Sequence, residues 1–314
     1  MYTIELKDAK SNMISLVGRK SAYLGEVINL GFNVPKGFVI TSRAFQRFIS
    51  NIKDEIDEIL SAVNINRIEE IEVKSQRIKN LILKTEIPED ISSEILERAK
   101  ELGNDYLAVR STVTSPLSGP SFAGEYDTYL FVSKDEILNV VRRVWASYYN
   151  VRAIAYRIAT GDYSPIAVLV QKMINSRSAG TAITLHPITE EQDYVFIESA
   201  WGLGEAVTRG MVTPDQVIVS KASRKIVARR NSEKSIMLTY DFVEKKVKSL
   251  SLIGTEMYSK PSISESEAIK IANFGIALEN FFKRPVNIEW AIDENNEIYL
   301  LEVRGYRKVI SSEY

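Results

Sequence analysis

Cysteine is absent from this chain, and histidine occurs once, as His186. The lack of cysteine excludes disulfides, thiolate metal sites and a cysteine nucleophile. A single histidine cannot form a histidine metal pair, and no serine stands out as its partner in a Ser-His triad. Because His186 lies beside a proline in the segment TLHPIT, we expect it to have a structural or incidental role.

Long apolar runs and an excess of charge of one sign are also missing. No apolar run approaches the ~20 residues of a membrane-spanning helix, and the first residues show no signal-like pattern. Lys and Arg number 40 and Asp and Glu number 41, so no net field attracts nucleic acid or an anionic membrane. We therefore expect no nucleic-acid partner, no membrane partner and a cytoplasmic location.

The composition that is present is that of a globular protein. A chain of 314 residues with 45% hydrophobic residues can bury a sizeable core and divide into two lobes. The first third alternates predicted strands and helices, whereas short strands dominate after the segment GDYSP. We predict an α+β fold with an N-terminal lobe of residues 1–163 and a C-terminal lobe of residues 164–314.

Two capping-box patterns mark helix starts, Ser133 with Glu136 and Ser264 with Glu267. The first predicts one helix that runs to about Thr160, and the second predicts a helix that ends near FFKRP. Between them, the segment QVIVSKASRKIVA has the pattern of a hairpin.

Residues 287–305, NIEWAIDENNEIYLLEVRG, have the pattern of a β-hairpin whose tip is the Asn-Asn pair. This register places Glu289 opposite Glu302 and Asn287 opposite Arg304, all on one face because strand side chains alternate. The opposite face is expected to be a core surface made of Ile288, Trp290, Ile292, Tyr299, Leu301 and Val303.

Directly opposed carboxylates destabilise a sheet unless a cation lies between them. Two hard oxygen ligands suit Mg²⁺, which binds one or two carboxylates together with waters and substrate phosphates. The sequence therefore suggests a metal site at Glu289 and Glu302. The alternative is a solvated polar face on which Arg304 neutralises one of the two acids.

Three further charged residues are candidates for ligand contacts. Lys20 lies near an expected helix start, where backbone amides and a lysine form an anion site, although such a lysine is usually solvated. Arg110 follows the strand pattern YLAV directly and is placed at the end of that strand, either beside a ligand or in an ion pair. Glu198 ends another predicted strand and either contacts a ribose hydroxyl or lies at a rim. The loop SGPSFAG has small residues that could close over phosphates.

Five segments of this sequence together resemble a known family. The nucleotide-binding domain of phosphoenolpyruvate synthase and pyruvate phosphate dikinase, which rifampin phosphotransferase and the glucan water dikinases share, carries similar segments in the same order. The segments are GRKSAYLGEVINLGFNVPKGFVIT, AVRSTVTSPLSGPSFAGEYDTYL, LVQKMINSRSAGTAITLHPIT, ESAWGLGEAVTRGMVTPDQVIV and NIEWAIDENNEIYLLEVR.

The resemblance implies an ATP-grasp fold, in which two lobes hold ATP and Mg²⁺ between them. By resemblance, the phosphates are contacted by Lys20, Arg110 and Arg304. The adenine is held at Gln171 and Met173, and the ribose is contacted by Glu198. Glu289 and Glu302 occupy the positions of the metal-associated pair. In the family, ATP phosphorylates a histidine on a separate mobile domain, which implies a phosphohistidine-domain partner here.

The sequence departs from the family pattern at several positions. The usual Gly-Gly-Lys-Gly is replaced by residues 18–21, Gly-Arg-Lys-Ser, and the acids usual after the arginine strand are replaced by Ser115 and Pro116. Asn287 stands for a usual aspartate and Glu302 for a usual glutamine. The phosphohistidine signature is absent from these residues.

Our leading interpretation is a stand-alone ATP-binding component of a dikinase, which binds Mg-ATP and phosphorylates a histidine on a separate partner chain. The alternatives are a decayed ATP-sensing or structural module, the nucleotide domain of an antibiotic- or glucan-type phosphotransferase, and a fragment of a longer enzyme.

Overall fold

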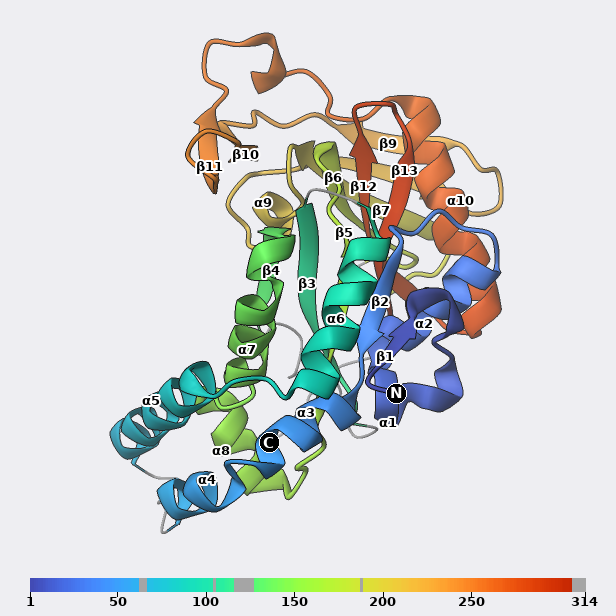
Figure 1. The fold of residues 1–314 in the computed structure, drawn as a ribbon. Coiled ribbons are helices and arrows are strands. Elements are labelled where there is room, and N and C mark those ends of the chain that lie inside the picture. Colours follow the sequence, from blue (N-terminus) through green and yellow to red (C-terminus); the bar gives the residue numbers. More distant parts are fainter. Residues whose placement is uncertain (62–66, 104–105, 116–126, 187–188, 307–314) are drawn as a thin grey trace. The chain divides into compact units, whose positions relative to one another are not determined.

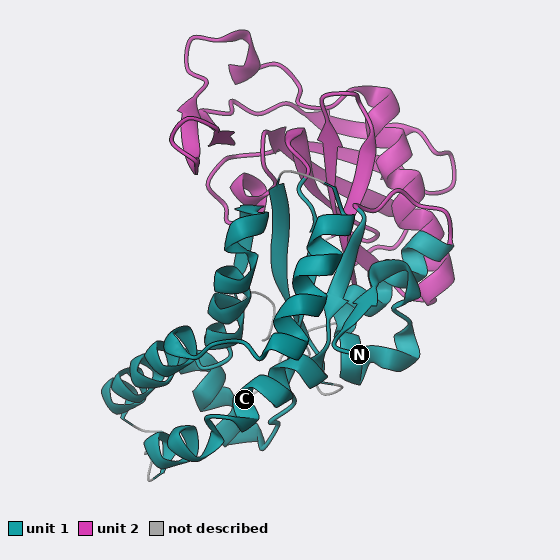
Figure 2. Cartoon of the chain, in the orientation of Figure 1, with its two compact units in different colours: residues 1–29, 36–173 teal, residues 30–35, 174–314 magenta. Residues whose placement is uncertain are grey.

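The computed structural model describes residues 1–61, 67–103, 106–115, 127–186 and 189–306 (Figure 1). The chain forms two compact units, of which unit 1 comprises residues 1–29 and 36–173 and unit 2 comprises residues 30–35 and 174–314 (Figure 2). The lobe division between residues 163 and 164 stays a prediction.

Unit 1 is built on a five-stranded antiparallel sheet in the order β1-β2-β5-β3-β4. The strands are β1 (Thr3–Glu5), β2 (Gly37–Ile40), β3 (Tyr106–Val113), β4 (Thr128–Ser133) and β5 (Ile166–Lys172). The α-helices of this unit are α1 (Ile14–Val17), α2 (Arg19–Asn29), α3 (Ser42–Ser50), α4 (Lys53–Leu60), α5 (Ile68–Lys84), α6 (Glu89–Glu101), α7 (Ile137–Ser147) and α8 (Val151–Thr160). Among its described residues, short 3-10 turns lie at η1 (Leu6–Asp8), η2 (Ser11–Met13) and η4 (Lys134–Glu136).

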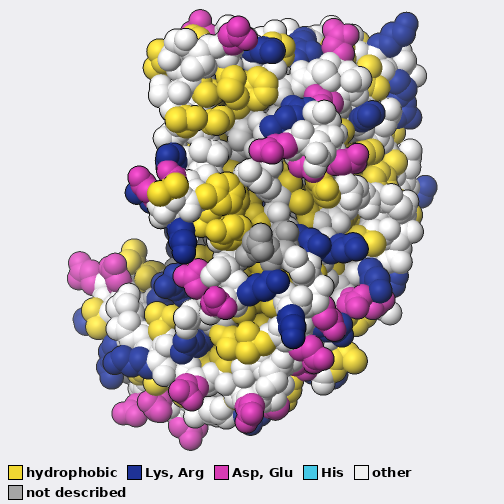
Figure 3. Space-filling view, turned by 45° about the horizontal axis from the view of Figure 1, so that its top comes forward, with side chains coloured by type: hydrophobic (Ala, Val, Ile, Leu, Met, Phe, Trp, Pro, Cys, Tyr) yellow, Lys and Arg dark blue, Asp and Glu magenta, His cyan; other side chains and the backbone are white. Residues whose placement is uncertain are grey.

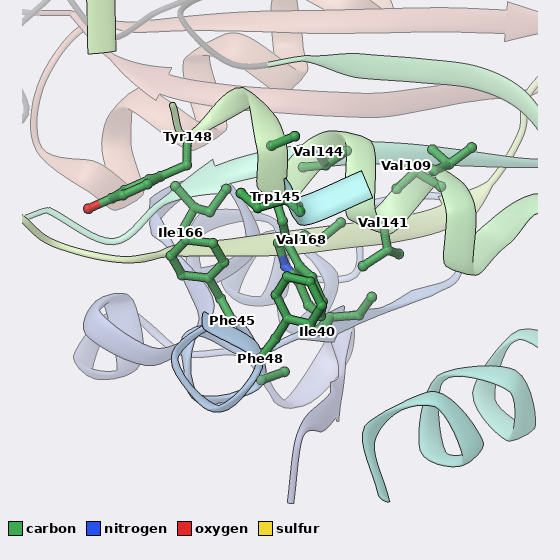
Figure 4. Close-up of a cluster of buried hydrophobic side chains, with 14 of the residues drawn as sticks. Ile40, Phe45, Phe48, Val109, Val141, Val144, Trp145, Tyr148, Ile166 and Val168 are labelled. Atoms are coloured by element: carbon green, nitrogen blue, oxygen red, sulfur yellow. The ribbon is translucent and has the colours of Figure 1, made fainter. Parts of the chain in front are cut away.

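The core of unit 1 lies between one face of this sheet and the helices α3 and α7 (Figure 4). Trp145 of α7 is fully buried, and its ring centroid lies 4.8 Å from that of Phe48 and 6.2 Å from that of Phe45, both on α3. The strands supply alternate apolar residues, among them Val109 and Val168. Because this face of β3 and β5 is committed to the core, the residues between these positions point to the other face.

Unit 2 is built on a six-stranded antiparallel sheet in the order β13-β12-β6-β7-β8-β9. Its strands are β6 (Ser176–Ile183), β7 (Tyr194–Trp201), β8 (Asp215–Ser220), β9 (Ile226–Arg230), β12 (Val286–Asp293) and β13 (Ile298–Gly305). A separate antiparallel pair consists of β10 (Ile236–Asp241) and β11 (Lys246–Ser251). The helical segments are α9 (Glu205–Thr208), η5 (Glu256–Tyr258) and α10 (Glu265–Phe282).

Helix α10 covers one face of the six-stranded sheet. It approaches so closely that a Cβ added at Gly275 would lie 2.9 Å from Cγ2 of Thr184. The α+β class predicted from the sequence is confirmed by these helices and antiparallel sheets, and β8 pairs with β9 as the predicted hairpin.

The two predicted capping boxes have different outcomes. Ser264 caps α10 as predicted, because its hydroxyl accepts a hydrogen bond from the Glu267 N–H and the Glu267 carboxylate accepts one from the Ser264 N–H. Ser133 makes no such cap, because its hydroxyl donates to the carboxylate of Glu136 (2.9 Å). The single helix predicted after Ser133 is also wrong, since α7 ends at Ser147 and α8 begins at Val151.

The predicted position of Arg110 at a strand end is wrong. Strand β3 continues through Val113, because Ser111 and Thr112 pair with Val168 and Ala167 of β5. The sheet is antiparallel, so the rule for ligands at the carboxyl ends of parallel strands does not apply to it. Glu198 likewise lies inside β7, which continues to Trp201. The SGPSFAG loop and Pro116 lie outside the described residues.

His186 has local contacts that agree with a structural role. Its Nδ1 accepts a hydrogen bond from the Thr189 N–H (3.1 Å), and its ring lies edge-on to Phe196 at 6.1 Å between centroids.

In the described part of the chain, no helix has the length and apolar character needed to cross a membrane. Positive and negative side chains are interspersed on the face of the molecule shown in Figure 3. That distribution agrees with the near-neutral net charge of the sequence.

Candidate functional site

The hairpin of β12 and β13 has the predicted pairing at the end that lies away from its tip. Glu289 faces Glu302 and Asn287 faces Arg304. The Asp293 carboxylate organises the tip, since its Oδ1 accepts hydrogen bonds from the N–H groups of Asn295 and Glu297, both at 2.9 Å. The register derived from the sequence is therefore correct for this half of the hairpin.

The other half of the hairpin is shifted by one residue. Trp290 pairs with Leu300, so Leu301 is the extra residue of a β-bulge. Consequently Leu300 is fully buried, while Tyr299 and Leu301 are only partly buried. The prediction that Tyr299 and Leu301 belong to the core face was wrong, because a regular hairpin without a bulge was assumed.

Arg304 lies within reach of both hairpin acids. Its Nε donates to Glu302 Oε1, and its Nη2 lies 3.8 Å from Glu289 Oε1. Burial acts to lower the pKa of Arg304, but the charge and hydrogen bond of Glu302, followed by the charge of Glu289, outweigh it and raise the pKa. The Glu302 side chain is 3% exposed and that of Glu289 is 27% exposed. Glu302 is thus the acid held by the arginine, and Glu289 is the more accessible one.

The residues of this end suit a magnesium ion. Oδ1 of Asn287 is buried and accepts no hydrogen bond from any described residue, which leaves an oxygen lone pair without a partner beside the two acids. Mg²⁺ takes such oxygen ligands and completes its octahedron with waters and phosphates. Across the described ranges there is no group of three or more His, Asp or Glu side chains that could hold a metal. The candidate oxygen donors at this end are therefore those of Glu289, Glu302 and Asn287.

A row of polar side chains crosses the six-stranded sheet at the level of Glu289. The strand registers place directly adjacent residues in the order Glu302, Glu289, Thr181, Glu198, Gln216 and Arg230. This row lies on the sheet face opposite to α10. The helix contacts Thr184 directly after β6, and Thr184 and Thr181 point to opposite faces because they are three residues apart along an extended chain. Neighbouring strands are about 4.8 Å apart, so Glu198 lies about 10 Å from Glu289.

Sequence reasoning missed Thr181, Gln216 and Arg230 of this row, and Gln216 is the one that contacts a predicted site residue. Its Nε2 donates to Glu198 Oε1 (3.3 Å), which fixes the carboxylate predicted to contact a ribose. The only signal in the sequence is a polar residue in the alternating strand QVIVS. That Gln216 faces Glu198 depends on the register between β7 and β8, and the sequence of the loop between these strands does not reveal that register.

Unit 1 gathers its predicted site residues on the sheet face opposite to its aromatic core. Arg110 on β3 pairs with Leu169, and Ala108 pairs with Gln171 on β5, so Arg110 and Gln171 share a face. Gln171 is buried and Arg110 is partly buried. Met173 follows β5 directly, and its N–H donates to the Tyr106 carbonyl (3.0 Å).

Lys20 is the second residue of α2, which begins over this same face of unit 1. Gly18 precedes the helix with φ +75°, and a Cβ added there would lie 2.2 Å from Oγ1 of Thr112, on the face of Arg110. Only glycine permits both this conformation and this approach. The helix start with Lys20 is thereby held close to the end of β3.

Two departures from the expected family pattern contact each other. Nη2 of Arg19 donates to the backbone carbonyl of Ser115 (3.2 Å), and the Ser115 hydroxyl donates to Asp162. The carboxylate of Asp162 is held in turn by the Ser164 N–H (3.0 Å). The bulky Arg19 side chain is therefore engaged with the segment that follows β3.

Comparisons with known proteins identify relatives along the whole chain. The phosphoenolpyruvate synthase of Aeropyrum pernix is 37% identical over 92% of this chain and 40% of its own length. The probable phosphoenolpyruvate synthases of Archaeoglobus fulgidus and Staphylothermus marinus are 37% and 33% identical, over 97% and 96% of this chain. The chain spans about two-fifths of the length of these relatives.

Solved structures show a more distant likeness. The D-alanine-D-alanine ligase from Coxiella burnetii matches at 14% identity, with a TM-score of 0.31 over 69% of this chain and 40% of that chain. The dinucleotide-forming acetyl-coenzyme A synthetase 1 of Ca. Korarchaeum cryptofilum matches at 8% identity, with a TM-score of 0.34 over 69% of this chain and 82% of that chain.

The family model for the pyruvate phosphate dikinase AMP/ATP-binding domain matches residues 14–312. This match covers nearly the whole chain and includes every predicted site residue. The resemblance inferred from the sequence is confirmed by this match and by the relatives. The chain belongs to the family of pyruvate phosphate dikinase AMP/ATP-binding domains.

Proposed function

We propose that this chain binds ATP together with Mg²⁺ and transfers a phosphoryl group to a histidine that lies outside these 314 residues. Family membership supports the nucleotide, and the names of the relatives support a dikinase-type phosphotransferase. The observation that carries the proposal is the hairpin end. It combines two facing carboxylates, a cation and a buried amide oxygen that accepts no hydrogen bond from the described residues, all on one sheet face.

We assign roles from the chemistry of each side chain. Glu289 and Glu302 hold Mg²⁺, with Asn287 as a neutral oxygen donor. Lys20, Arg110 and Arg304 neutralise the phosphates. Gln171 and Met173 hold the adenine, and Glu198, oriented by Gln216, contacts the ribose.

Mg²⁺ would neutralise charge on the phosphates, and the side chains of the protein would hold the phosphates in a fixed position. Phosphoryl transfer asks little covalent chemistry of the protein, so fixed cations and fixed geometry account for most of the rate. The helix start at Lys20, held by Gly18 against β3, gives such a fixed cation. Arg304, held by Glu302, gives another.

The acceptor is proposed to be a histidine of a phosphohistidine domain, in the cytoplasm. His186 is not a candidate because its Nδ1 already accepts a hydrogen bond within its own turn. A test would combine the purified chain, ATP labelled at its β-phosphate, Mg²⁺ and a recombinant phosphohistidine domain of a phosphoenolpyruvate synthase. We expect acid-labile label on that domain, with AMP and phosphate as products. Absence of ATP binding by calorimetry with Mg²⁺ present would refute the proposal.

A second candidate is an ATP-binding module without phosphoryl transfer. It is favoured by Arg19, which adds a bulky cation next to Lys20 and contacts Ser115. This candidate predicts ATP binding with Mg²⁺ and no labelling of the added phosphohistidine domain. The same labelling experiment therefore separates the two candidates.

A further inference from the structure

Residues 30–35, here called the strap, belong to unit 2 although α2 before them and β2 after them belong to unit 1. Val34 of the strap is buried, and the Phe32 ring packs edge-on against Phe274 of α10, with 5.3 Å between centroids. The strap is therefore part of the packed structure of unit 2.

Asn33 of the strap binds the edge of the six-stranded sheet at two points. Its backbone carbonyl accepts a hydrogen bond from the Leu300 N–H (2.9 Å). Its side-chain Nδ2 donates to the Ile298 carbonyl (3.3 Å). Both groups belong to β13, the edge strand of the sheet, and face away from β12. One residue thus satisfies the two backbone groups that a neighbouring strand would otherwise pair.

These two contacts lie immediately before the bulge at Leu301. If the register of Trp290 with Leu300 continued without a bulge, Leu301 would face Glu289, and Glu302 would face Ile288 on the core side of the sheet. The bulge returns Glu302 and Arg304 to the face of Glu289. The side chains proposed to hold Mg²⁺ and the phosphates therefore depend on the position of this bulge.

We propose that Asn33 is a positioning residue for the metal end of the hairpin. It holds β13 on the tip side of the bulge, so that the extra residue stays at Leu301 and Glu302 stays opposite Glu289. This inference rests on the proposed function of Glu289 and Glu302, and it adds a residue from the strap that acts through the edge of β13.

The test uses Asn33→Ala, which removes the Nδ2 donor and keeps the backbone carbonyl, and Asn33→Asp, which places a carboxylate oxygen against the Ile298 carbonyl. Asn231→Ala is the matched control, because Asn231 is an exposed asparagine of unit 2 whose side-chain Oδ1 accepts a hydrogen bond from Arg229 Nε (3.0 Å). Two quantities are measured: the Mg²⁺ concentration for half-maximal ATP binding, and the exchange rate of the Leu300 amide.

We expect Asn33→Ala to raise both quantities about fivefold, the factor that corresponds to one net hydrogen bond. Asn33→Asp should raise the Mg²⁺ requirement and the exchange rate further, because the new carboxylate oxygen would then repel the carbonyl oxygen of Ile298. ATP binding without Mg²⁺ and the thermal midpoint should stay near wild type, and Asn231→Ala should change none of these quantities. A purely structural role would lower the midpoint without moving the Mg²⁺ dependence.

The two proposals fail in different ways. If the wild-type chain shows no Mg²⁺-dependent ATP binding, the proposed function is refuted. The exchange rate of the Leu300 amide still reports whether Asn33 holds β13 in place. If the wild type binds and Asn33→Asp has an unchanged Mg²⁺ dependence, the positioning role of Asn33 is refuted and the proposed function stands.

Discussion

Unit 2 carries two ionic clusters on opposite faces of its six-stranded sheet. On the α10 side, Asp215 and Lys234 form an ion pair of 2.7 Å, and neither side chain is exposed. On the other side lie Glu289, Glu302 and Arg304, with exposed fractions of 27%, 3% and 44%. The two faces follow from alternation, because Asp215 and Gln216 are consecutive residues of β8.

The buried cluster is closed. Oδ1 of Asp215 accepts from Lys234 and from the Ser232 N–H, and Oδ2 accepts from the N–H and the hydroxyl of Ser262, all at 2.7–2.8 Å. The Ser262 hydroxyl also contacts that of Ser199 (2.8 Å), the residue paired with Asp215. The cluster ties β8 to the segments before β10 and α10.

The hairpin cluster is open by contrast. It combines two acids with a half-exposed arginine, and Oδ1 of Asn287 accepts no hydrogen bond from the described residues. A buried cluster in which every group is satisfied serves the fold, whereas a buried polar atom without a hydrogen bond calls for an explanation such as a bound ion. Two predictions test this distinction, and two with smaller expected effects test the cap of α10.

The largest expected effect is on the closed cluster. Lys234→Ala leaves the Asp215 carboxylate buried without its counter-ion, and we expect it to cost about 3–5 kcal/mol of unfolding free energy. The double variant Asp215→Ala/Lys234→Met should recover a large part of that loss. Urea unfolding followed by tryptophan fluorescence measures both.

Lys248→Met is the matched control, because Lys248 pairs with Asp241 in the same unit while its own side chain is 41% exposed. Its urea midpoint should stay near that of the wild type. An equal loss in Lys248→Met and Lys234→Ala would contradict the structural role assigned to the buried cluster.

Substitutions in the open cluster should change the affinity for Mg²⁺ more than the free energy of unfolding. Glu289→Gln removes the more accessible acid, and we expect the Mg²⁺ affinity in the presence of ATP to fall at least about tenfold, or ~1.4 kcal/mol. Glu302→Gln should have a smaller effect, because Arg304 already neutralises that carboxylate and glutamine keeps an oxygen donor. Calorimetric titrations with and without Mg²⁺ measure the difference. Equal losses in both variants would mean that both carboxylates bind the ion with full charge.

A smaller effect separates the two serine motifs. Ser264→Ala removes an observed N-cap from α10 and should cost about 1 kcal/mol. Ser133→Ala removes a hydroxyl that caps no helix, and its cost should stay within about 0.5 kcal/mol. Thermal unfolding of the two variants provides the measurement, and equal costs would contradict the assigned roles.

The smallest expected effect is on the acid side of the stability curve. Burial acts to raise the pKa of Glu267, but the hydrogen bonds from Ser264 and the charge of Arg177 lower it overall. Because the pKa of Glu267 is lower in the folded state, its carboxylate stabilises the folded state at pH values above the unfolded pKa of 4.5. This stabilisation is lost as the pH falls through the folded pKa. The stability of Glu267→Gln should therefore depend less on pH below about 4.5 than that of the wild type. Parallel pH dependences in urea titrations would argue against this linkage.

Sequence reasoning was most accurate where the information is local. The Glu289–Glu302 facing pair and the capping box at Ser264 follow from spacing over a few residues, and both are observed. It was least accurate where a distant element decides. The failed cap at Ser133, the continuation of β3 past Arg110 and the bulge at Leu301 depend on helix packing or on a neighbouring strand.

The sequence by itself determined the family, the two facing acids and the residue types proposed to hold phosphate and metal, because periodicity and ordered motifs are properties of the chain. Only the tertiary structure decided which acid Arg304 holds and that Glu198 shares a row with Glu289. Only the structure, too, placed Asn33 against β13. A bulge shifts side chains to the other face without a signature in the alternation, and pairing across 265 residues leaves no local trace.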